Sequence, residues 1–124
     1  MRLVSGLIKN EGMVLIVQYK KPIDKDYEWF LPVVEAGDID SPKKLIKEYF
    51  KNKLNLDVEI DGDVLKSSPS NDPDTEILIY PLKMLGGFLK SSDEFSIVKW
   101  IPPKDIPKYF SARLSYKVSQ FLEI

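Results

Sequence analysis

Four lysines in the middle of the chain are spaced so that they would share one face of a helix. They are Lys43, Lys44, Lys47 and Lys51, which recur at intervals of three and four residues. A row of ammonium groups attracts phosphate, so this face is a candidate site for a phosphate-bearing ligand. A lysine row is also typical of a helix face that is only solvated. The sequence leaves both interpretations open.

The residue types that are missing limit the chemistry of this chain. It has no histidine and no cysteine. Imidazole bases, Ser-His-Asp triads, thiolate nucleophiles, disulfides and the usual zinc sites are therefore excluded. A metal site could use only oxygen ligands, which favours Mg²⁺ or Mn²⁺. Because 18 basic and 19 acidic residues leave a net charge of −1, the sequence indicates no DNA or RNA partner.

Length and composition are typical of one globular domain, residues 1–124. The chain has 44% hydrophobic and 30% charged residues. The apolar stretch 1–17 is interrupted by polar residues at 9–12, so we do not expect a signal peptide or a membrane span. A cytoplasmic location without a membrane partner is the expectation.

Hydrophobic patterns predict strands around one central helix and one terminal helix. Strands are expected at 3–9, 13–19, 29–32, 75–85 and 95–101, with one or two short strands within 57–66 and a turn at 86–87. A helix should begin at Pro42, capped by Ser41, and end at a left-handed Asn55. Its apolar stripe is Leu45, Ile46, Tyr49 and Phe50, with Lys53 snorkelling on the same side. Ser111 is the expected cap of the last helix.

The order of these elements predicts a mixed α/β fold with a sheet between two helices. Trp29-Phe30-Leu31-Pro32, the loop after it and the lysine-rich helix resemble the Nudix box, the metal-binding loop and helix of the MutT-like Nudix hydrolases. The family pattern is G-x5-E-x7-R-E-U-x-E-E-x-G-U, where U is bulky and apolar. Asp93-Glu94, Trp100, Pro102-Pro103 and the last helix also follow the family's order. The resemblance implies a Nudix-like α/β/α sandwich with a mixed sheet between helices.

The catalytic part of the box is largely missing. In Nudix hydrolases, glutamates on one helix face hold Mg²⁺ against the substrate diphosphate. With the pattern aligned on Leu56, the first glutamate falls on Tyr49 and the adjacent pair falls on Asn52-Lys53. A shift by one residue matches Lys47-Glu48 to the family's Arg-Glu, but the pair then falls on Lys51-Asn52. A lysine opposes metal binding strongly, since one unit charge at ~4 Å is worth about 4 kcal/mol.

The remaining acids allow a divergent metal site. If the protein is a hydrolase, the resemblance assigns metal binding to Glu35, Asp38, Asp40 and Glu48, and catalysis to Glu48 and Glu94. As alternatives, Glu48 would pair with Lys44 or Lys51 on a solvated face, and Glu94 would help to cap a turn. Trp29 is a candidate ligand-stacking residue, with core packing as the alternative.

A Nudix framework without its usual glutamates predicts a catalytically degenerate domain. Such a domain would bind a nucleotide, another phosphate-bearing ligand or a protein partner, would need no cofactor, and could form a homodimer. The alternative is a divergent Mg²⁺- or Mn²⁺-dependent hydrolase of nucleoside diphosphate-linked compounds. A third alternative is a structural or interaction subunit without a small ligand.

Overall fold

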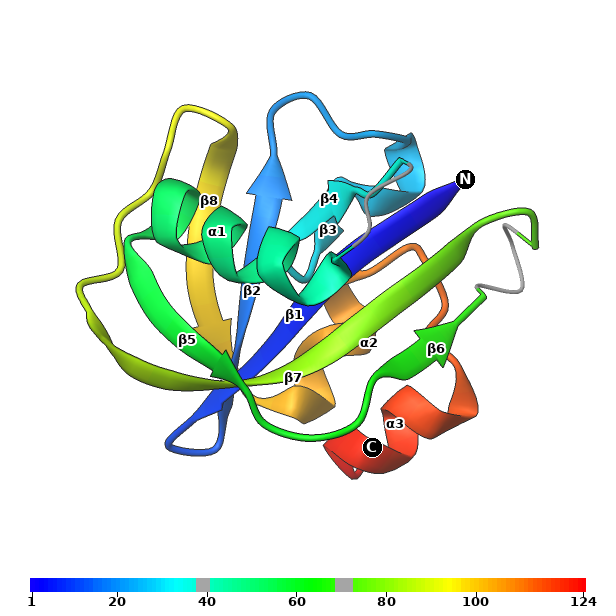
Figure 1. The fold of residues 1–124 in the computed structure, drawn as a ribbon. Helices are drawn as coiled ribbons and strands as arrows, with labels where there is room; N and C mark the ends of the chain where they lie inside the picture. The colour runs from blue at the N-terminus through cyan, green and yellow to red at the C-terminus, as the bar shows by residue number, and fades with distance from the viewer. Residues whose placement is uncertain (38–40, 69–72) are drawn as a thin grey trace.

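The computed structural model describes residues 1–37, 41–68 and 73–124 (Figure 1). Its strands are β1 (Arg2–Asn10), β2 (Met13–Tyr19), β3 (Trp29–Phe30), β4 (Val33–Glu35), β5 (Leu56–Ile60), β6 (Leu65–Ser67), β7 (Glu76–Gly87) and β8 (Phe95–Ile101). Its helices are α1 (Pro42–Leu54), α2 (Ile106–Tyr109) and α3 (Tyr116–Leu122), with short 3-10 turns η1 (Lys25–Tyr27) and η2 (Pro103–Asp105). This is the predicted mixed α/β fold.

Strand β1 organises the sheet. It pairs in parallel with β7, from Arg2 opposite Glu76 to Ile8 opposite Leu82. It pairs antiparallel with β4 and, at its far end, with β2. Strands β5 and β6 pair with β7, while β3 and β8 pair with β2. The sheet is therefore mixed. The pairing of β2 with β8 places the start of β8 beside the end of β2, where the candidate site lies.

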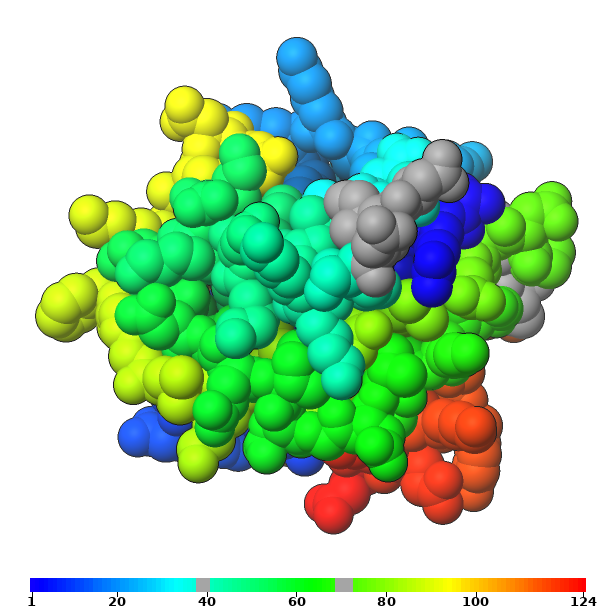
Figure 2. Space-filling model, viewed as in Figure 1, coloured from blue at the N-terminus to red at the C-terminus, as the bar shows by residue number. Residues whose placement is uncertain are grey.

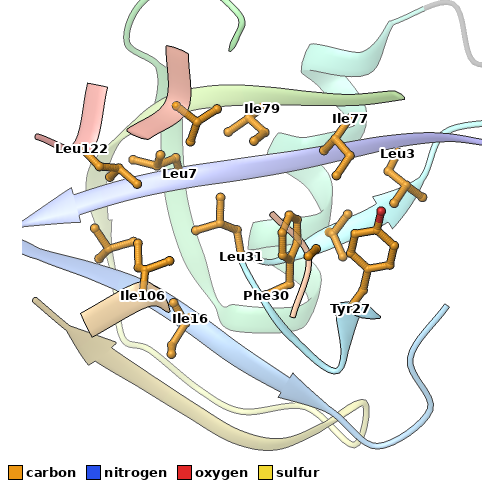
Figure 3. Close-up of a cluster of buried hydrophobic side chains, with 14 of the residues drawn as sticks. Leu3, Leu7, Ile16, Tyr27, Phe30, Leu31, Ile77, Ile79, Ile106 and Leu122 are labelled. Carbon is orange, nitrogen blue, oxygen red and sulfur yellow. The ribbon is translucent and has the colours of Figure 1, made fainter. Parts of the chain in front are cut away.

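Alternate residues of β1 enter two separate hydrophobic clusters. Leu3 and Leu7 lie in the cluster that α3 covers, together with other side chains labelled in Figure 3. Val4 and Ile8 lie in the cluster under α1, whose buried residues are Ile46, Phe50 and Leu54. A helix thus covers each face of the sheet, which explains why residues 3–9 show no polar side.

Helix α1 begins and ends where its capping residues predict. The Ser41 hydroxyl accepts a hydrogen bond from the Lys44 amide at 3.4 Å, and Pro42 occupies the first helical position. Asn55 ends the helix in the left-handed conformation with a φ of 57°. These caps fix where α1 begins and ends.

Several element boundaries differ from the sequence expectation. Strand β7 continues through Gly86 and Gly87, where a turn was predicted, because these glycines pair with the start of β5. The last helix begins after Ser115, not after Ser111. The short strand β4 was not predicted, because its pairing with β1 is a long-range contact.

The segment 20–28 is rich in charged residues, yet it contains a buried aromatic residue. Tyr27 is fully buried, and its ring lies 5.2 Å from the ring of Phe30 in an edge-to-face arrangement. Within the ranges that the structure describes, no helix is long and apolar enough to cross a membrane.

Candidate functional site

The end of β2, the segment before β8 and helix α1 meet at one end of the molecule (Figure 1). The Lys20 amide donates to the Glu94 carbonyl at 2.9 Å and joins the first two of these segments. In the space-filling view, α1 and the segment before β8 form adjoining parts of one face (Figure 2). The cleft described below opens among these elements.

The cleft has an outer and an inner part. The outer part encloses about 330 Å³ and is lined by Tyr19, Lys20, Lys21, Asp93 and Glu94. The inner part encloses about 160 Å³ and is lined by Tyr19, Lys21, Ile23, Tyr27, Val33, Val34, Glu35, Tyr49 and Glu94. Both parts share Tyr19, Lys21 and Glu94, so they form one continuous site. The outer part is lined mostly by charged side chains, whereas the inner part combines Lys21, Glu35 and Glu94 with apolar and phenolic side chains.

A chain of hydrogen bonds runs along the floor of the cleft. The Tyr19 hydroxyl accepts from the Val33 amide at 2.8 Å and donates to the Val33 carbonyl at 2.9 Å. It also lies 2.8 Å from the Tyr49 hydroxyl, which in turn lies 3.2 Å from a carboxylate oxygen of Glu94. Residues from β2, β4, α1 and the segment before β8 thus form one network.

The two phenols of this network have fewer hydroxyl protons than there are contacts that need one. The Val33 carbonyl, the contact between the two phenols and the Glu94 carboxylate each need a proton, but Tyr19 and Tyr49 supply only one each. The contact to Glu94 is the longest of the three. Glu94 is therefore the acceptor that the two phenols satisfy least.

Both phenols stay protonated under ordinary conditions. Burial is the main cause that raises the pKa of Tyr49, and the neighbouring Tyr19 and Glu94 raise it further. Burial also raises the pKa of Tyr19, although its hydrogen bonds to Tyr49 and Val33 act in the opposite direction. The two phenols of the cleft floor are thus neutral, and Tyr49 donates a hydrogen bond to the Glu94 carboxylate.

Helix α1 carries a partly buried row of side chains, from which Tyr49 lines the inner part of the cleft. Leu45, Tyr49 and Lys53 follow one another at intervals of four residues, next to the fully buried row of the same helix. The Lys53 ammonium lies 4.0 Å from the Glu94 carboxylate. Two residues of this row, Tyr49 and Lys53, therefore contact Glu94.

The described residues do not form the carboxylate cluster of a metal site built from protein ligands alone. Mg²⁺ and Mn²⁺ need several oxygen ligands, of which carboxylates are the most effective. No group of three or more acidic residues comes together within ranges 1–37, 41–68 and 73–124. At Glu94 the neighbours are a neutral phenol and an ammonium group. A phenol and an ammonium group donate hydrogen bonds and are not ligands for a divalent cation.

Several solved structures share this arrangement of strands and helices. An ADP-ribose pyrophosphatase from Streptococcus suis has a TM-score of 0.72 at 21% identity, over 98% of this chain and 89% of that chain. A Nudix hydrolase from Nitrosomonas europaea has a TM-score of 0.74 at 17% identity, over 98% and 69%. The chain has the Nudix fold. An Ap4A hydrolase from C. elegans is also similar, with a TM-score of 0.66 at 15% identity, over 98% and 92%. No protein-family model and no curated protein matches the sequence.

The Nudix fold brings two of the sequence-predicted acids to the cleft. Glu35 lines the inner part, and Glu94 lines both parts. Glu48 instead lies in a shallow groove on the other side of α1, beside β5. Asp38 and Asp40 lie outside the described residues. Glu48 and Glu94 therefore do not share a cavity.

The four predicted ligand-binding lysines do not line the cleft. Lys43, Lys44, Lys47 and Lys51 are all exposed on the outer face of α1. Lys47 and Lys51 line the groove that contains Glu48, and Lys51 forms an ion pair with Asp57 at 3.0 Å. Their role in ligand binding stays a prediction.

Trp29 lies against α2, away from the cleft lining. Its ring is 4.9 Å from the ring of Tyr109, and the Lys99 ammonium lies 5.4 Å from its centre. This packing matches the structural alternative given for Trp29.

The sequence could not place Tyr19 in the site, and sequence reasoning missed Lys20, Lys21 and Lys53. Tyr49 was assigned to the apolar stripe, and Lys53 was expected to snorkel there. The available signal was their spacing of four residues along the margin of that stripe, together with the family alignment on Leu56. Both features placed Tyr49 and Lys53 at positions where the family has glutamates.

Proposed function

We propose that this Nudix-fold domain binds a phosphate-bearing ligand of the nucleotide class in the cleft and does not hydrolyse it by metal-dependent chemistry. The observation that carries the proposal is the contact of Tyr49 and Lys53 with Glu94. These two positions correspond to metal-binding glutamates of the family when the pattern is aligned on Leu56. A phenol and an ammonium bind phosphate oxygens well and divalent cations poorly.

The shape and charge of the cleft support this proposal. Its outer part alone encloses about 330 Å³, within the range of about 300–1,000 Å³ typical of ligand pockets. Lys20 and Lys21 line this outer part, where a phosphate would lie. The inner part has aromatic and aliphatic walls suited to a ring.

Calorimetric titration in the presence of EDTA tests the proposal. ADP, ADP-ribose and inorganic pyrophosphate should bind the wild-type protein without added metal. Lys53→Gln should weaken binding about tenfold, since it removes a charge from the cleft. Lys44→Gln is the matched control, because Lys44 is exposed on the outer face of the same helix. Equal weakening in both variants would instead favour the lysine face as the binding site.

A divergent hydrolase is the second candidate, because Glu35 and Glu94 line the same cavity. The similar solved structures are hydrolases by name, among them an ADP-ribose pyrophosphatase and an Ap4A hydrolase. A panel of nucleoside di- and triphosphates, dinucleoside polyphosphates and nucleotide sugars with Mg²⁺ or Mn²⁺ tests this candidate. Turnover that is lost in Glu94→Gln or Glu48→Gln would replace the binding proposal by the hydrolase one.

The proposed homodimer or protein partner concerns a different property and needs its own measurement. Analytical ultracentrifugation of the purified chain over a range of concentrations distinguishes a monomer from a dimer. A stable dimer would confirm this part of the proposal, whereas a monomer at all concentrations would leave only a heterologous partner.

A further inference from the structure

The backbone of Glu94 is held firmly, but its side chain is not. The Glu94 carbonyl accepts from the Lys20 amide at 2.9 Å, and its own amide donates to the Ser92 hydroxyl at 3.4 Å. Among the residues that the structure describes, its carboxylate contacts the Tyr49 hydroxyl at 3.2 Å and the Lys53 ammonium at 4.0 Å, and the side chain is 43% exposed. An exposed ion pair of this kind contributes little to stability. Moving the carboxylate away from Tyr49 and Lys53 therefore costs little free energy.

The groups around this carboxylate would suit a stronger anion better. Tyr49 is a donor that stays protonated, and Lys53 carries a full positive charge beside it. Lys20 and Lys21 line the adjoining outer part of the cleft. A phosphate group has more acceptor oxygens than a carboxylate and usually more charge, so it can contact several of these donors at once.

We propose that the Glu94 carboxylate is a resident anion in the phosphate subsite, and that the ligand's phosphate displaces it. The phosphate then takes over the contacts with the Tyr49 hydroxyl and the Lys53 ammonium, while the Glu94 side chain turns toward solvent. No covalent step is involved. The proposal rests on the proposed ligand-binding function and assigns Glu94, Tyr49 and Lys53 to its phosphate subsite. Glu94 thereby sets a minimum affinity for the ligand. Only an anion that binds the Tyr49 hydroxyl and the Lys53 ammonium more tightly than a carboxylate does can replace it.

An acid next to Glu94 provides a matched control. Asp93 is next to Glu94 in the sequence and lines the outer part of the same cleft. Asp93→Asn removes the same charge from the same cavity and leaves the Glu94 contacts with Tyr49 and Lys53 intact. General charge repulsion predicts similar effects for Asp93→Asn and Glu94→Gln. Displacement of a resident anion predicts a much larger effect for Glu94→Gln.

Titration with inorganic pyrophosphate in EDTA tests the inference. Glu94→Gln should bind pyrophosphate about tenfold more tightly than the wild type, and Asp93→Asn at most about threefold more tightly. Glu94→Ala should behave like Glu94→Gln, which controls for new contacts made by the amide. Adding Tyr49→Phe or Lys53→Gln to Glu94→Gln should reverse most of the gain. Thermal unfolding of each variant checks that the fold is retained.

The possible results separate this inference from the proposed function. Binding by the wild type that is unchanged or weaker in both Glu94 variants would overturn the displacement and leave the binding function intact. Equal gains in Asp93→Asn and Glu94→Gln would also overturn it. The absence of binding in the wild type and in every variant would overturn both proposals. Binding that is detectable only in the Glu94 variants would support the displacement.

Discussion

Tyr19 and Tyr49, thirty residues apart in the chain, join β2 to α1 through a 2.8 Å contact between their hydroxyl groups. Tyr19 also holds both the amide and the carbonyl of Val33 in β4. This one phenol therefore links three elements that border the cleft. It fixes how α1 sits over the sheet and so where Tyr49 and Lys53 point.

Removal of the Tyr19 hydroxyl should destabilise the fold more than removal of the Tyr49 hydroxyl. Tyr19→Phe leaves the partly buried Val33 amide and carbonyl without this partner and should cost about 2 kcal/mol, whereas Tyr49→Phe should cost about 1 kcal/mol. Because the phenols contact each other, the double variant should show a coupling of about 1 kcal/mol. Urea denaturation measures all three, with Tyr116→Phe, 78% exposed, as the control. A cost for Tyr19→Phe equal to that of Tyr116→Phe would contradict the expectation.

Stability should fall steeply in alkali because of the two buried phenols. Burial raises the pKa of Tyr19 and Tyr49 above the usual value of 10.0. Between pH 10 and the raised pKa, the folded state binds more protons than the unfolded state, so the free energy of unfolding decreases as pH rises. Each phenol contributes a slope of up to about 1.4 kcal/mol per pH unit, and this contribution is fully present below pH 10.

Unfolding measured in urea from about pH 8 to pH 11 tests this alkaline loss. Tyr49→Phe should lose less stability than the wild type over the upper part of that range, because one phenol no longer titrates. Tyr116→Phe, exposed on α3, should follow the wild type. Parallel curves for all three proteins would exclude the buried phenols as the cause.

Gly87 and Gly86 should differ sharply in their tolerance of alanine. Gly87 has a φ of 97°, and a Cβ there would overlap the backbone carbonyl oxygen of Asn55. Gly87→Ala should therefore cost about 3 kcal/mol. At Gly86 a Cβ meets no atom within 4 Å, so Gly86→Ala should change stability by less than about 0.5 kcal/mol. Thermal unfolding of both variants measures the two losses of stability. Equal losses would show that the end of β7 is not packed against Asn55.

Replacement of the two neighbours of Glu94, the neutral Tyr49 and the cationic Lys53, by glutamate should create a metal site. Tyr49→Glu with Lys53→Glu would place three carboxylates together, which suits Mn²⁺. The double variant should bind Mn²⁺ at about 0.1 mM or below, whereas the wild type should show no binding near 1 mM. Electron paramagnetic resonance of free Mn²⁺ measures both. Lys43→Glu with Lys47→Glu adds acids to the exposed face of α1 as the control, and binding equal to that of the control would contradict the site geometry.

The sequence alone determined the framework of this protein. The first two strands, helix α1 with its caps at Ser41 and Asn55, and the mixed α/β class with the Nudix arrangement all agree with the structure. These features depend on local signals: turn residues, capping residues and the repeat of apolar positions. The absence of histidine and cysteine is equally decisive, because it excludes imidazole and thiolate chemistry whatever the fold.

Only the tertiary structure decided which polar residues share the cleft. Glu48 and Tyr49 are adjacent in the sequence, yet one faces a groove beside β5 and the other contacts Glu94. The reason is that neighbouring residues on a helix point about 100° apart, and the rotation of α1 is set by the burial of Phe50 against β1 and β7. The partners of Tyr49 come from β2 and from the segment before β8. Contacts over such distances along the chain depend on strand pairing that no local pattern encodes.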